Sequence, residues 1–421
     1  TIDELPENNT MIKIIALLYF STFLWFKGVP DAGTIALGLL GLFCVIHRNT
    51  REKILRDIGG WTAQDTWVSL AIASVFVFKM TSMLWASSPE LAMKNALWHS
   101  YFMIWPLVFF AFCYLRLRVV QALQAMAVGL IVLGVWNVIA LMFGVPLYHM
   151  RAGFDLNAGI LAELLLVMGT WLFVAVTDKS ERFQSLQKWL FGVGSLSAWF
   201  VLYTTERRTE WIGFFVIVVV VGIWRIRHWL TLPRALALLG LLLGACVAFF
   251  YLREERFLLA YHEALAYWQQ AQAGGANNSI VTSVGARMEM YRLGISAFID
   301  HPLIGNSADI RPDRLPQYGG GGLGGEQFHH RHFHSEYLQV LVEGGVVWAA
   351  IFMTAVVYFI RAFIVKPFQS SNLISMLAFA LMASYMLAGT ISASLIYTQA
   401  VATFTVFSAL LWANLRLKPQ Q

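Results

Sequence analysis

Four arginines are the first candidates for chemistry, and three of them lie close to a long apolar stretch, where charge is costly. Arg207 and Arg208 lie in a short turn between two apolar stretches, Arg151 lies in another short connection, and Arg287 begins a helical pattern in a long polar segment. A guanidinium donates two parallel hydrogen bonds and keeps its proton, so it suits phosphate groups. Ionisable groups near membrane depth are usually functional. For Arg207 the alternative is an ion pair with a glutamate of the same turn.

A histidine marks the point where a polar segment becomes an apolar helix. Ser335 is a favourable N-cap, which places His334 at the mouth of that helix. A histidine at a wet helix entrance can act as a general base near neutral pH. The alternative is an interfacial histidine that only caps or hydrogen-bonds. Glu336, Gln339 and Glu343 recur at helical spacing, which predicts a polar face that points into the protein.

The histidines of this region also raise the question of a metal. Four of them lie within six residues, at His329, His330, His332 and His334. Imidazoles close to Glu326 and Glu336 could bind a transition metal. The spacing matches no standard zinc pattern, however, and the glycine run Gly319–Gly325 is a poor rigid scaffold. We therefore expect no metal and no other cofactor, and interpret the glycine run as a flexible loop or lid over the site.

The composition defines the kind of scaffold that positions these residues. Of 421 residues, 58% are hydrophobic and only 13% are charged, about half the charged share of a soluble domain. This excludes a soluble multidomain protein, a disordered chain, a disulfide-stapled secreted module and a nucleic-acid-binding domain. Apolar stretches of 18 or more residues recur, which predicts an all-α, polytopic membrane protein.

We expect about twelve transmembrane helices, near residues 11–27, 30–47, 65–86, 94–115, 118–144, 157–176, 187–204, 211–229, 232–252, 336–363, 372–390 and 394–415. With a cytoplasmic N-terminus, every loop expected inside is basic, from Arg48–Arg56 to Arg416 and Lys418. This positive-inside bias accounts for most of the net charge of +6 without an anionic ligand. Both termini are then cytoplasmic, and the four arginines and His334 face outward.

The expected spans divide the chain into three parts. Residues 1–252 hold the first nine spans, residues 253–335 form one long outer loop, and residues 336–421 hold the last three spans. Within the loop we predict two helices, at 253–273 and 286–299, before the glycine- and histidine-rich stretch. Pro302 ends the second of these helices.

Three segments together resemble the O-antigen ligase and polymerase superfamily of bacterial envelope glycosyltransferases. They are Arg207–Trp211 at an outer helix start, Arg287–Gly305 with its His-Pro-Leu-Ile-Gly ending, and His334–Gly344 at the start of a late span. Arg151–Asn157 is a fainter fourth match. Each motif is weak alone, but their order, their common side and the many-span layout make the combination specific. A single long outer loop and a histidine at position 334 favour the ligase branch over the polymerases.

The resemblance implies a GT-C-like enzyme at the periplasmic face of the bacterial inner membrane. It would move O-antigen glycan from undecaprenyl pyrophosphate to the lipid A–core oligosaccharide, with inversion and without metal. Its implied catalytic residues are His334 as base with Arg208 and Arg287 at the pyrophosphate, and its implied substrate-binding residues are Arg151, Arg207, Glu336 and Tyr337. We expect donor, acceptor and membrane lipids as partners, and no nucleic acid; the sequence leaves the oligomeric state open.

Two alternative functions remain. An O-antigen polymerase of the same superfamily would use the same donor. A transporter or flippase for an anionic lipid-linked glycan could use the outer arginines to recruit its substrate. Against the transporter, polar groups gather at the outer mouth and few lie at mid-membrane, with Lys79 and Glu163 as the main exceptions. The chain also lacks the inverted repeats of broken helices that are typical of transporters.

Overall fold

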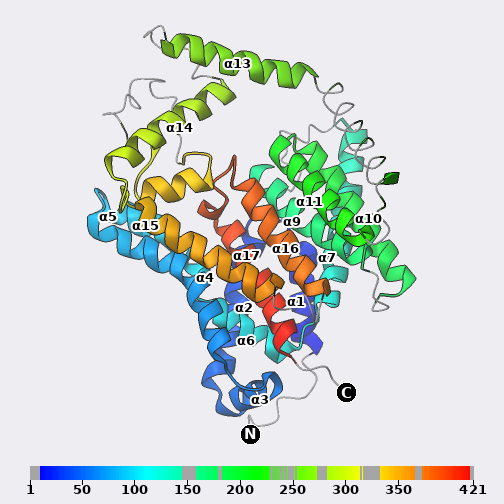
Figure 1. The fold of residues 1–421 in the computed structure, drawn as a ribbon. Helices are drawn as coiled ribbons and strands as arrows, with labels where there is room; N and C mark the ends of the chain where they lie inside the picture. Colours follow the sequence, from blue (N-terminus) through cyan, green and yellow to red (C-terminus); the bar gives the residue numbers. More distant parts are fainter. Residues whose placement is uncertain are drawn as a thin grey trace.

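The computed structural model describes residues 10–144, 158–178, 183–227, 254–272, 282–312, 332–365 and 372–417, with Leu315 and isolated positions between 231 and 251. Within these residues the chain is helical and contains no strand (Figure 1). Together with the apolar character of the helices, this confirms the predicted all-α, polytopic membrane fold.

The helices of the first half are α1 (Thr10–Thr22), α2 (Gly28–Ile46), α3 (Arg48–Ile58), α4 (Ala63–Thr81), η1 (Ser82–Trp85), α5 (Pro89–Leu97), η2 (Ser100–Phe102), α6 (Trp105–Leu115), α7 (Val119–Met142), α9 (Ala158–Val176) and α10 (Ser185–Thr204). Those of the second half are α11 (Arg208–Ile226), α13 (Glu254–Gln272), α14 (Ser283–Asp300), α15 (Glu336–Phe359), the π-helical turn Ile360–Val365, α16 (Asn372–Ala388), η9 (Ser394–Ile396) and α17 (Thr398–Arg416).

Among the described residues, seven helical segments are long and apolar enough to cross a membrane: Gly28–Ile46, Ala63–Trp85, Val119–Met142, Ala158–Val176, Thr209–Ile226, Glu336–Val365 and Thr398–Arg416. Helices α1, α6 and α16 are apolar but shorter. The expected span at 232–252 lies largely outside the described residues, so the total of twelve stays a prediction.

One expected span is wrong as a single helix. Residues 94–115 form the end of α5, the 3₁₀ turn η2 and the separate helix α6. Pro106 is the second residue of α6. Within a continuous helix its ring would clash with the carbonyl four residues earlier, and it has no N–H to donate. The apolar stretch is long enough to span a membrane, but its proline requires a helix start.

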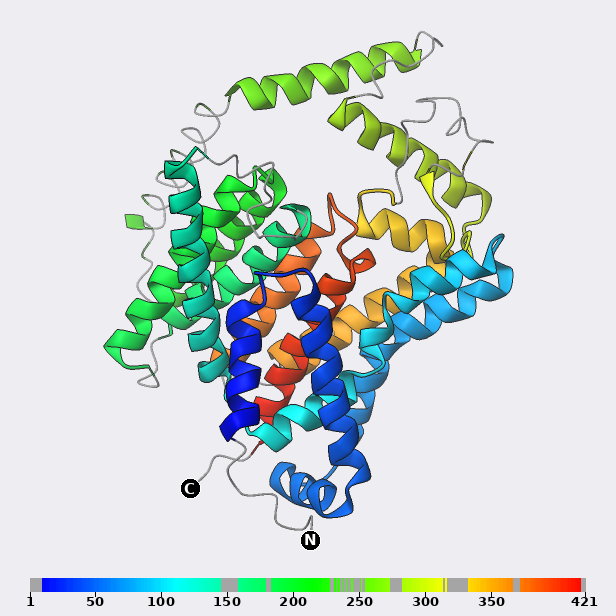
Figure 2. The same ribbon diagram turned by 180° about the vertical axis from the view of Figure 1, so that it is seen from behind.

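The helices form two groups with α16 and α17 between them (Figure 1). One group holds α7, α9, α10 and α11, and the other holds α2, α4, α5, α6 and α15 (Figures 1 and 2). Helices α9 and α17 lie deepest, since 83% and 78% of their apolar windows are buried inside the protein. Their side chains therefore meet other helices and not lipid, and polar residues on them can be held in fixed positions.

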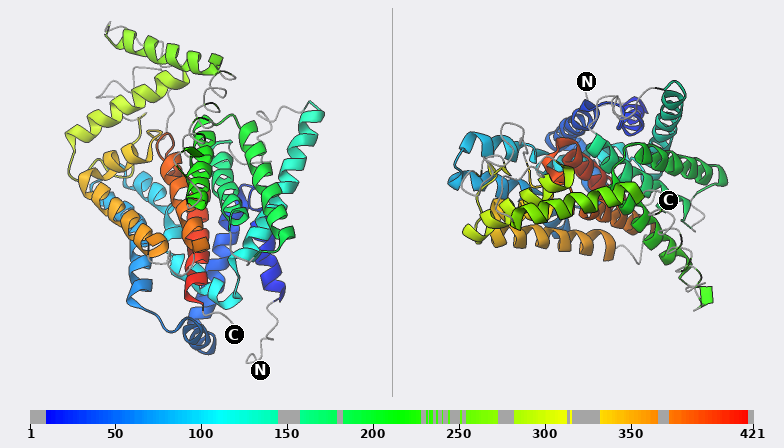
Figure 3. Two further views of the ribbon diagram at one scale, coloured as in Figure 1. Left: turned by 45° about the vertical axis from the view of Figure 1, so that its right-hand side comes forward. Right: turned by 90° about the horizontal axis from the view of Figure 1, so that it is seen from above.

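Helices α13 and α14 lie at one end of the bundle, opposite to α3 (Figures 1 and 3). They occupy the two helical stretches predicted in the long loop. A separate small core joins them to the start of α15, with Tyr267 from α13, Met290 and Leu293 from α14, Phe333 before α15 and Val342 inside it. Burying these apolar groups fixes α14 relative to α15.

Helix α15 is broken at Gly345, whose φ of +62° is accessible to glycine but strained for other residues. The break leaves backbone groups without helical partners, and the loop after α14 supplies them. Before the break, the N–H groups of Asn306 and Ser307 donate to the carbonyls of Val342 and Glu343, both at 2.8 Å. After it, the carbonyls of Pro302 and Leu303 accept from the N–H groups of Val346 at 2.8 Å and Val347 at 3.2 Å. Residues 302–307, which follow α14, therefore hold α14 against α15; we call this set of hydrogen bonds the clamp.

Candidate active site

His334 lies immediately before α15, in an unusual backbone conformation. Its φ is +51°, a region that costs a non-glycine residue about 1–3 kcal/mol. Ser335 caps the helix as predicted, since its Oγ accepts from the Leu338 N–H at 3.4 Å. The His334 N–H donates to Nδ1 of His332 at 3.2 Å, and the two rings lie 4.1 Å apart. The structure therefore places two imidazoles side by side at the helix entrance.

Tyr291 joins α14, the helix that carries Arg287, to His334. The Tyr291 hydroxyl, one helical turn after Arg287 on α14, donates to the backbone carbonyl of His334 at 3.3 Å. Burial raises the pKa of the Tyr291 phenol, and the nearby positive charge of Arg287 opposes that rise. The phenol therefore stays protonated at neutral pH and remains a donor. The second and third sequence motifs thus meet in space.

Arg207 approaches the same entrance from the other helix group. Its charge acts on the phenol of Tyr397, whose hydroxyl lies 3.4 Å from Nε2 of His332. Arg207 also forms an ion pair with Glu210, with Nε and Oε1 3.5 Å apart. The predicted alternative of a pair within the turn is therefore confirmed, and it neutralises a carboxylate that is only 3% exposed. That pairing is compatible with a second role at the site.

Two other predicted residues are only partly covered by the structure or lie outside it. Arg208 begins α11, but its side chain lies outside the described part of the structure. Arg151 lies outside the described residues altogether. Their assignment to substrate phosphates stays a prediction. His329, His330 and the glycine run are also outside the described residues, and within the described ones no group of three His, Cys, Asp or Glu side chains could hold a metal.

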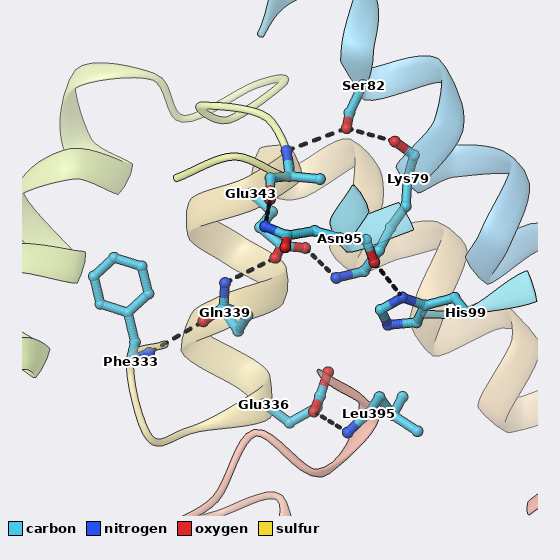
Figure 4. Close-up of polar contacts among 10 residues, drawn as sticks. Lys79, Ser82, Asn95, His99, Phe333, Glu336, Gln339, Glu343 and Leu395 are labelled. Carbon is cyan, nitrogen blue, oxygen red and sulfur yellow. Dashed lines mark hydrogen bonds and ion pairs between the residues drawn. The ribbon is translucent and has the colours of Figure 1, made fainter. Parts of the chain in front are cut away.

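Glu336 and Tyr337 lie in contacts between helices at the start of α15. Oε2 of Glu336 accepts from the Leu395 N–H at 3.0 Å (Figure 4), and the Glu336 N–H donates to the Gly389 carbonyl at 2.8 Å. The Tyr337 hydroxyl donates to the Met386 carbonyl at 2.8 Å. These bonds attach α15 to α16 and to the segment before α17. A contact of either residue with substrate stays a prediction.

Buried carboxylates from three helices gather below this entrance. Glu163 from α9 is only 2% exposed, and it interacts electrostatically with Glu210, Glu336 and Arg207. Arg207 is thus a positive charge within reach of several buried acids. The sequence marks Glu163 only as a polar exception in an apolar span, because its neighbours come from distant parts of the chain.

A second polar cluster joins α4 to α15. Lys79 Nζ donates to Oε2 of Glu343 at 2.6 Å, and both side chains are 4% exposed. Gln339 Nε2 donates to Oε1 of Glu343 at 2.7 Å, and Gln339 Oε1 accepts from the Phe333 N–H at 3.1 Å (Figure 4). This confirms that Gln339 and Glu343 of the predicted polar face point inward. It also provides Lys79 with a partner that the sequence did not identify.

An apolar cleft lies between α4, α15, α16 and α17. It is lined by Val75, Phe102, Phe352, Phe359, Met382 and Phe404, with Glu336 and Tyr337 also in its wall. The cleft therefore runs from apolar span surfaces to the helix start beside His334. Its apolar walls suit a hydrocarbon chain whose polar end lies at the entrance.

Residues 193–353 match the protein-family model Wzy_C, described as O-antigen ligase. The matched segment begins in α10 and ends in α15, so it contains Arg207, Arg208, Arg287 and His334. No curated protein matches the chain. The family match supports the superfamily that the three motifs resemble and a glycosyltransferase-like enzyme in a multi-pass membrane protein.

Proposed function

Because residues 193–353 match the family of O-antigen ligases, we propose that the chain is a WaaL-type ligase. It transfers O-antigen glycan from undecaprenyl pyrophosphate to a sugar hydroxyl of the lipid A–core oligosaccharide. The observation that carries this proposal is that α14, the helix of Arg287, holds the His334 backbone through Tyr291, inside the matched segment. Arg207 supports it from the opposite helix group.

The charges suit departure of a pyrophosphate. As the bond between the anomeric carbon and the phosphate oxygen breaks, its electron pair passes to that oxygen, and negative charge grows there. Fixed guanidinium groups in a poorly hydrated site stabilise this charge. Arg287 and Arg208 take this role, and Arg207 contributes from its position beside Glu210. The apolar cleft next to Glu336 receives the polyprenyl chain.

His334 suits activation of the acceptor. A sugar hydroxyl is a weak nucleophile, and a positioned imidazole can remove its proton as the hydroxyl oxygen attacks the anomeric carbon. The new bond forms as the bond to pyrophosphate breaks on the opposite face, so the anomeric configuration inverts. The reaction then takes place at the end of the bundle where α14 meets α15, which the charge pattern of the loops assigns to the periplasm.

A reconstituted assay tests this function against its two alternatives. The purified chain in lipid vesicles is given undecaprenyl-pyrophosphate-linked glycan and lipid A–core, and the products are separated on a gel. We expect the lipid A–core band to shift by the mass of the glycan. Longer glycans on the donor lipid, formed without acceptor, would identify a polymerase. A donor that changes leaflet without any covalent product would identify a transporter.

A further inference from the structure

We propose that Gln339, oriented by the buried Lys79–Glu343 ion pair, is a positioning residue for His334. This rests on the proposed function, because it takes His334 as the base. Gln339 itself need not touch substrate. It acts through the backbone of Phe333, the residue directly before His334, and the ion pair between α4 and α15 sets the direction in which its amide points.

The ion pair provides a fixed point inside the bundle. Lys79 and Glu343 are 264 positions apart in sequence, and their charged atoms lie 2.6 Å apart with 4% of each side chain exposed. Charges buried in this way stay ionised only when they are paired and hydrogen-bonded. Each oxygen of the Glu343 carboxylate has one donor, Lys79 for Oε2 and Gln339 for Oε1. The carboxylate is therefore held in one orientation.

This carboxylate determines which way the Gln339 amide points. An ionised carboxylate only accepts hydrogen bonds, so the NH₂ group of Gln339 must face Glu343. The amide oxygen then faces the opposite way and accepts from the Phe333 N–H at 3.1 Å. If the amide were flipped, its NH₂ group would face the N–H of Phe333 and its oxygen would face the carboxylate of Glu343, so both hydrogen bonds would be lost. In the series of hydrogen bonds from Lys79 to Phe333, each group can therefore only donate or only accept in the direction observed (Figure 4).

The bond to Phe333 matters because it holds the backbone directly before His334. The Phe333 side chain is fully buried in the small core that joins α13, α14 and α15. His334 has φ of +51°, which persists only when the surroundings enforce it. Three backbone groups of these two residues are held: the N–H of Phe333 by Gln339, the N–H of His334 by His332, and the carbonyl of His334 by Tyr291. Gln339 provides the link to the membrane-embedded bundle.

The polarity of the bonds allows an isosteric test. In Glu343→Gln alone, the NH₂ group of the new amide must face another donor, either Lys79 or the NH₂ group of Gln339. The second clash is avoided only if the Gln339 amide flips, and its bond with the Phe333 N–H is then lost. In Gln339→Glu alone, two carboxylates meet. In the double swap Gln339→Glu/Glu343→Gln, the carboxylate at 339 accepts from both the Phe333 N–H and the amide at 343, whose oxygen accepts from Lys79. Every hydrogen bond is restored, with the charge moved one helical turn.

The experiment measures kcat and KM for the donor in the reconstituted transfer assay, with thermal unfolding of each variant. We expect each single variant to lose ~10–100-fold in kcat, as for a misplaced catalytic group, with KM changed less than about threefold. We expect the double swap to recover kcat to within about threefold of the unmodified chain. A residue with only a structural role would not give this loss and recovery in kcat while unfolding temperatures stay similar.

The matched control is another buried ion pair between helices of the described residues. Arg225 at the end of α11 and Asp178 after α9 lie 3.5 Å apart and are 8% and 5% exposed. The double variant Asp178→Asn/Arg225→Gln should keep kcat even if it unfolds earlier. The positioning role would be overturned, with the proposed function intact, by a particular pair of results. His334→Ala would be inactive, and either the single variants of Gln339 and Glu343 would keep their kcat or the double swap would fail to recover it. A fully active His334→Ala would overturn the proposed function and this inference together.

Discussion

The hydroxyl of Tyr291 on α14 donates a hydrogen bond to the backbone carbonyl of His334, 3.3 Å away at the entrance of α15. Arg287 lies one turn earlier on the same helix, and its charge acts on the same phenol. A helix of the long loop therefore holds the candidate base and carries a candidate phosphate ligand. The position of α14 consequently controls both halves of the proposed chemistry.

Removing this hydroxyl should weaken catalysis modestly. Tyr291→Phe loses one hydrogen bond, worth about 0.5–1.5 kcal/mol, so we expect kcat for glycan transfer to fall about three- to tenfold. The control is Tyr267→Phe, which removes a phenol that donates to Glu289 at 2.7 Å in the same loop. It should change thermal stability and leave kcat unaltered. Equal kcat losses in the two variants would mean that loop stability, and not His334, is affected.

The break in α15 should tolerate only glycine. A Cβ on Gly345 would lie 2.4 Å from the Leu303 carbonyl carbon, in a backbone with φ of +62°. We expect Gly345→Ala to lower the unfolding temperature and the transfer rate together, because α14 loses its clamp. At Gly222 on α11, no described atom lies within 4 Å of the methyl group that alanine would add, so Gly222→Ala should be neutral or stabilising. Wild-type stability in Gly345→Ala would contradict the clamp.

Arg207 should contribute to stability as well as to substrate binding. Arg207→Ala leaves the carboxylate of Glu210, 3% exposed, without its charge partner, and we expect a loss of about 1–3 kcal/mol in the free energy of unfolding. The double variant Arg207→Ala/Glu210→Gln should regain stability. If Arg207 also binds the donor, KM for the donor stays raised in that double variant. A KM equal to that of the unmodified chain would limit Arg207 to its ion pair.

Arg287 should be required for transfer but not for folding. It is half-buried at the start of α14, and its loss removes positive charge where the leaving pyrophosphate gains negative charge. We expect Arg287→Ala to be produced and inserted normally, with an unfolding temperature near that of the unmodified chain, and to give no detectable lipid A–core product. Unimpaired transfer would remove Arg287 from the site.

Much of this arrangement could be predicted from the sequence, for identifiable reasons. Long apolar stretches specify helices wherever no proline interrupts them, so most expected spans coincide with helices. One exception, 94–115, contains Pro106 within the apolar stretch, and a second, 336–363, is interrupted at Gly345. Ser335 was predictable as a cap because hydroxyl side chains satisfy the first N–H groups of a helix. These features depend on residues close together in the chain.

The contacts between motifs could not be predicted in this way. A lone Lys79 in an apolar helix requires a partner, but nothing local shows that it is Glu343 in a helix far along the chain. Tyr397 carries no signal at all before its hydroxyl is seen 3.4 Å from His332. The break of α15 at Gly345 and the hydrogen bonds of residues 302–307 to its two sides also depend on tertiary structure. The sequence identifies the groups, and the packing decides which of them meet.

The most direct test of the account is the turnover of His334→Ala. In the reconstituted assay with undecaprenyl-pyrophosphate-linked glycan and lipid A–core, kcat should fall by ~10²–10⁴, as for a lost general base. KM for the donor and the unfolding temperature should stay close to those of the unmodified chain. Turnover near that of the unmodified chain would contradict the account, because His334 would then be only a residue at the entrance of α15.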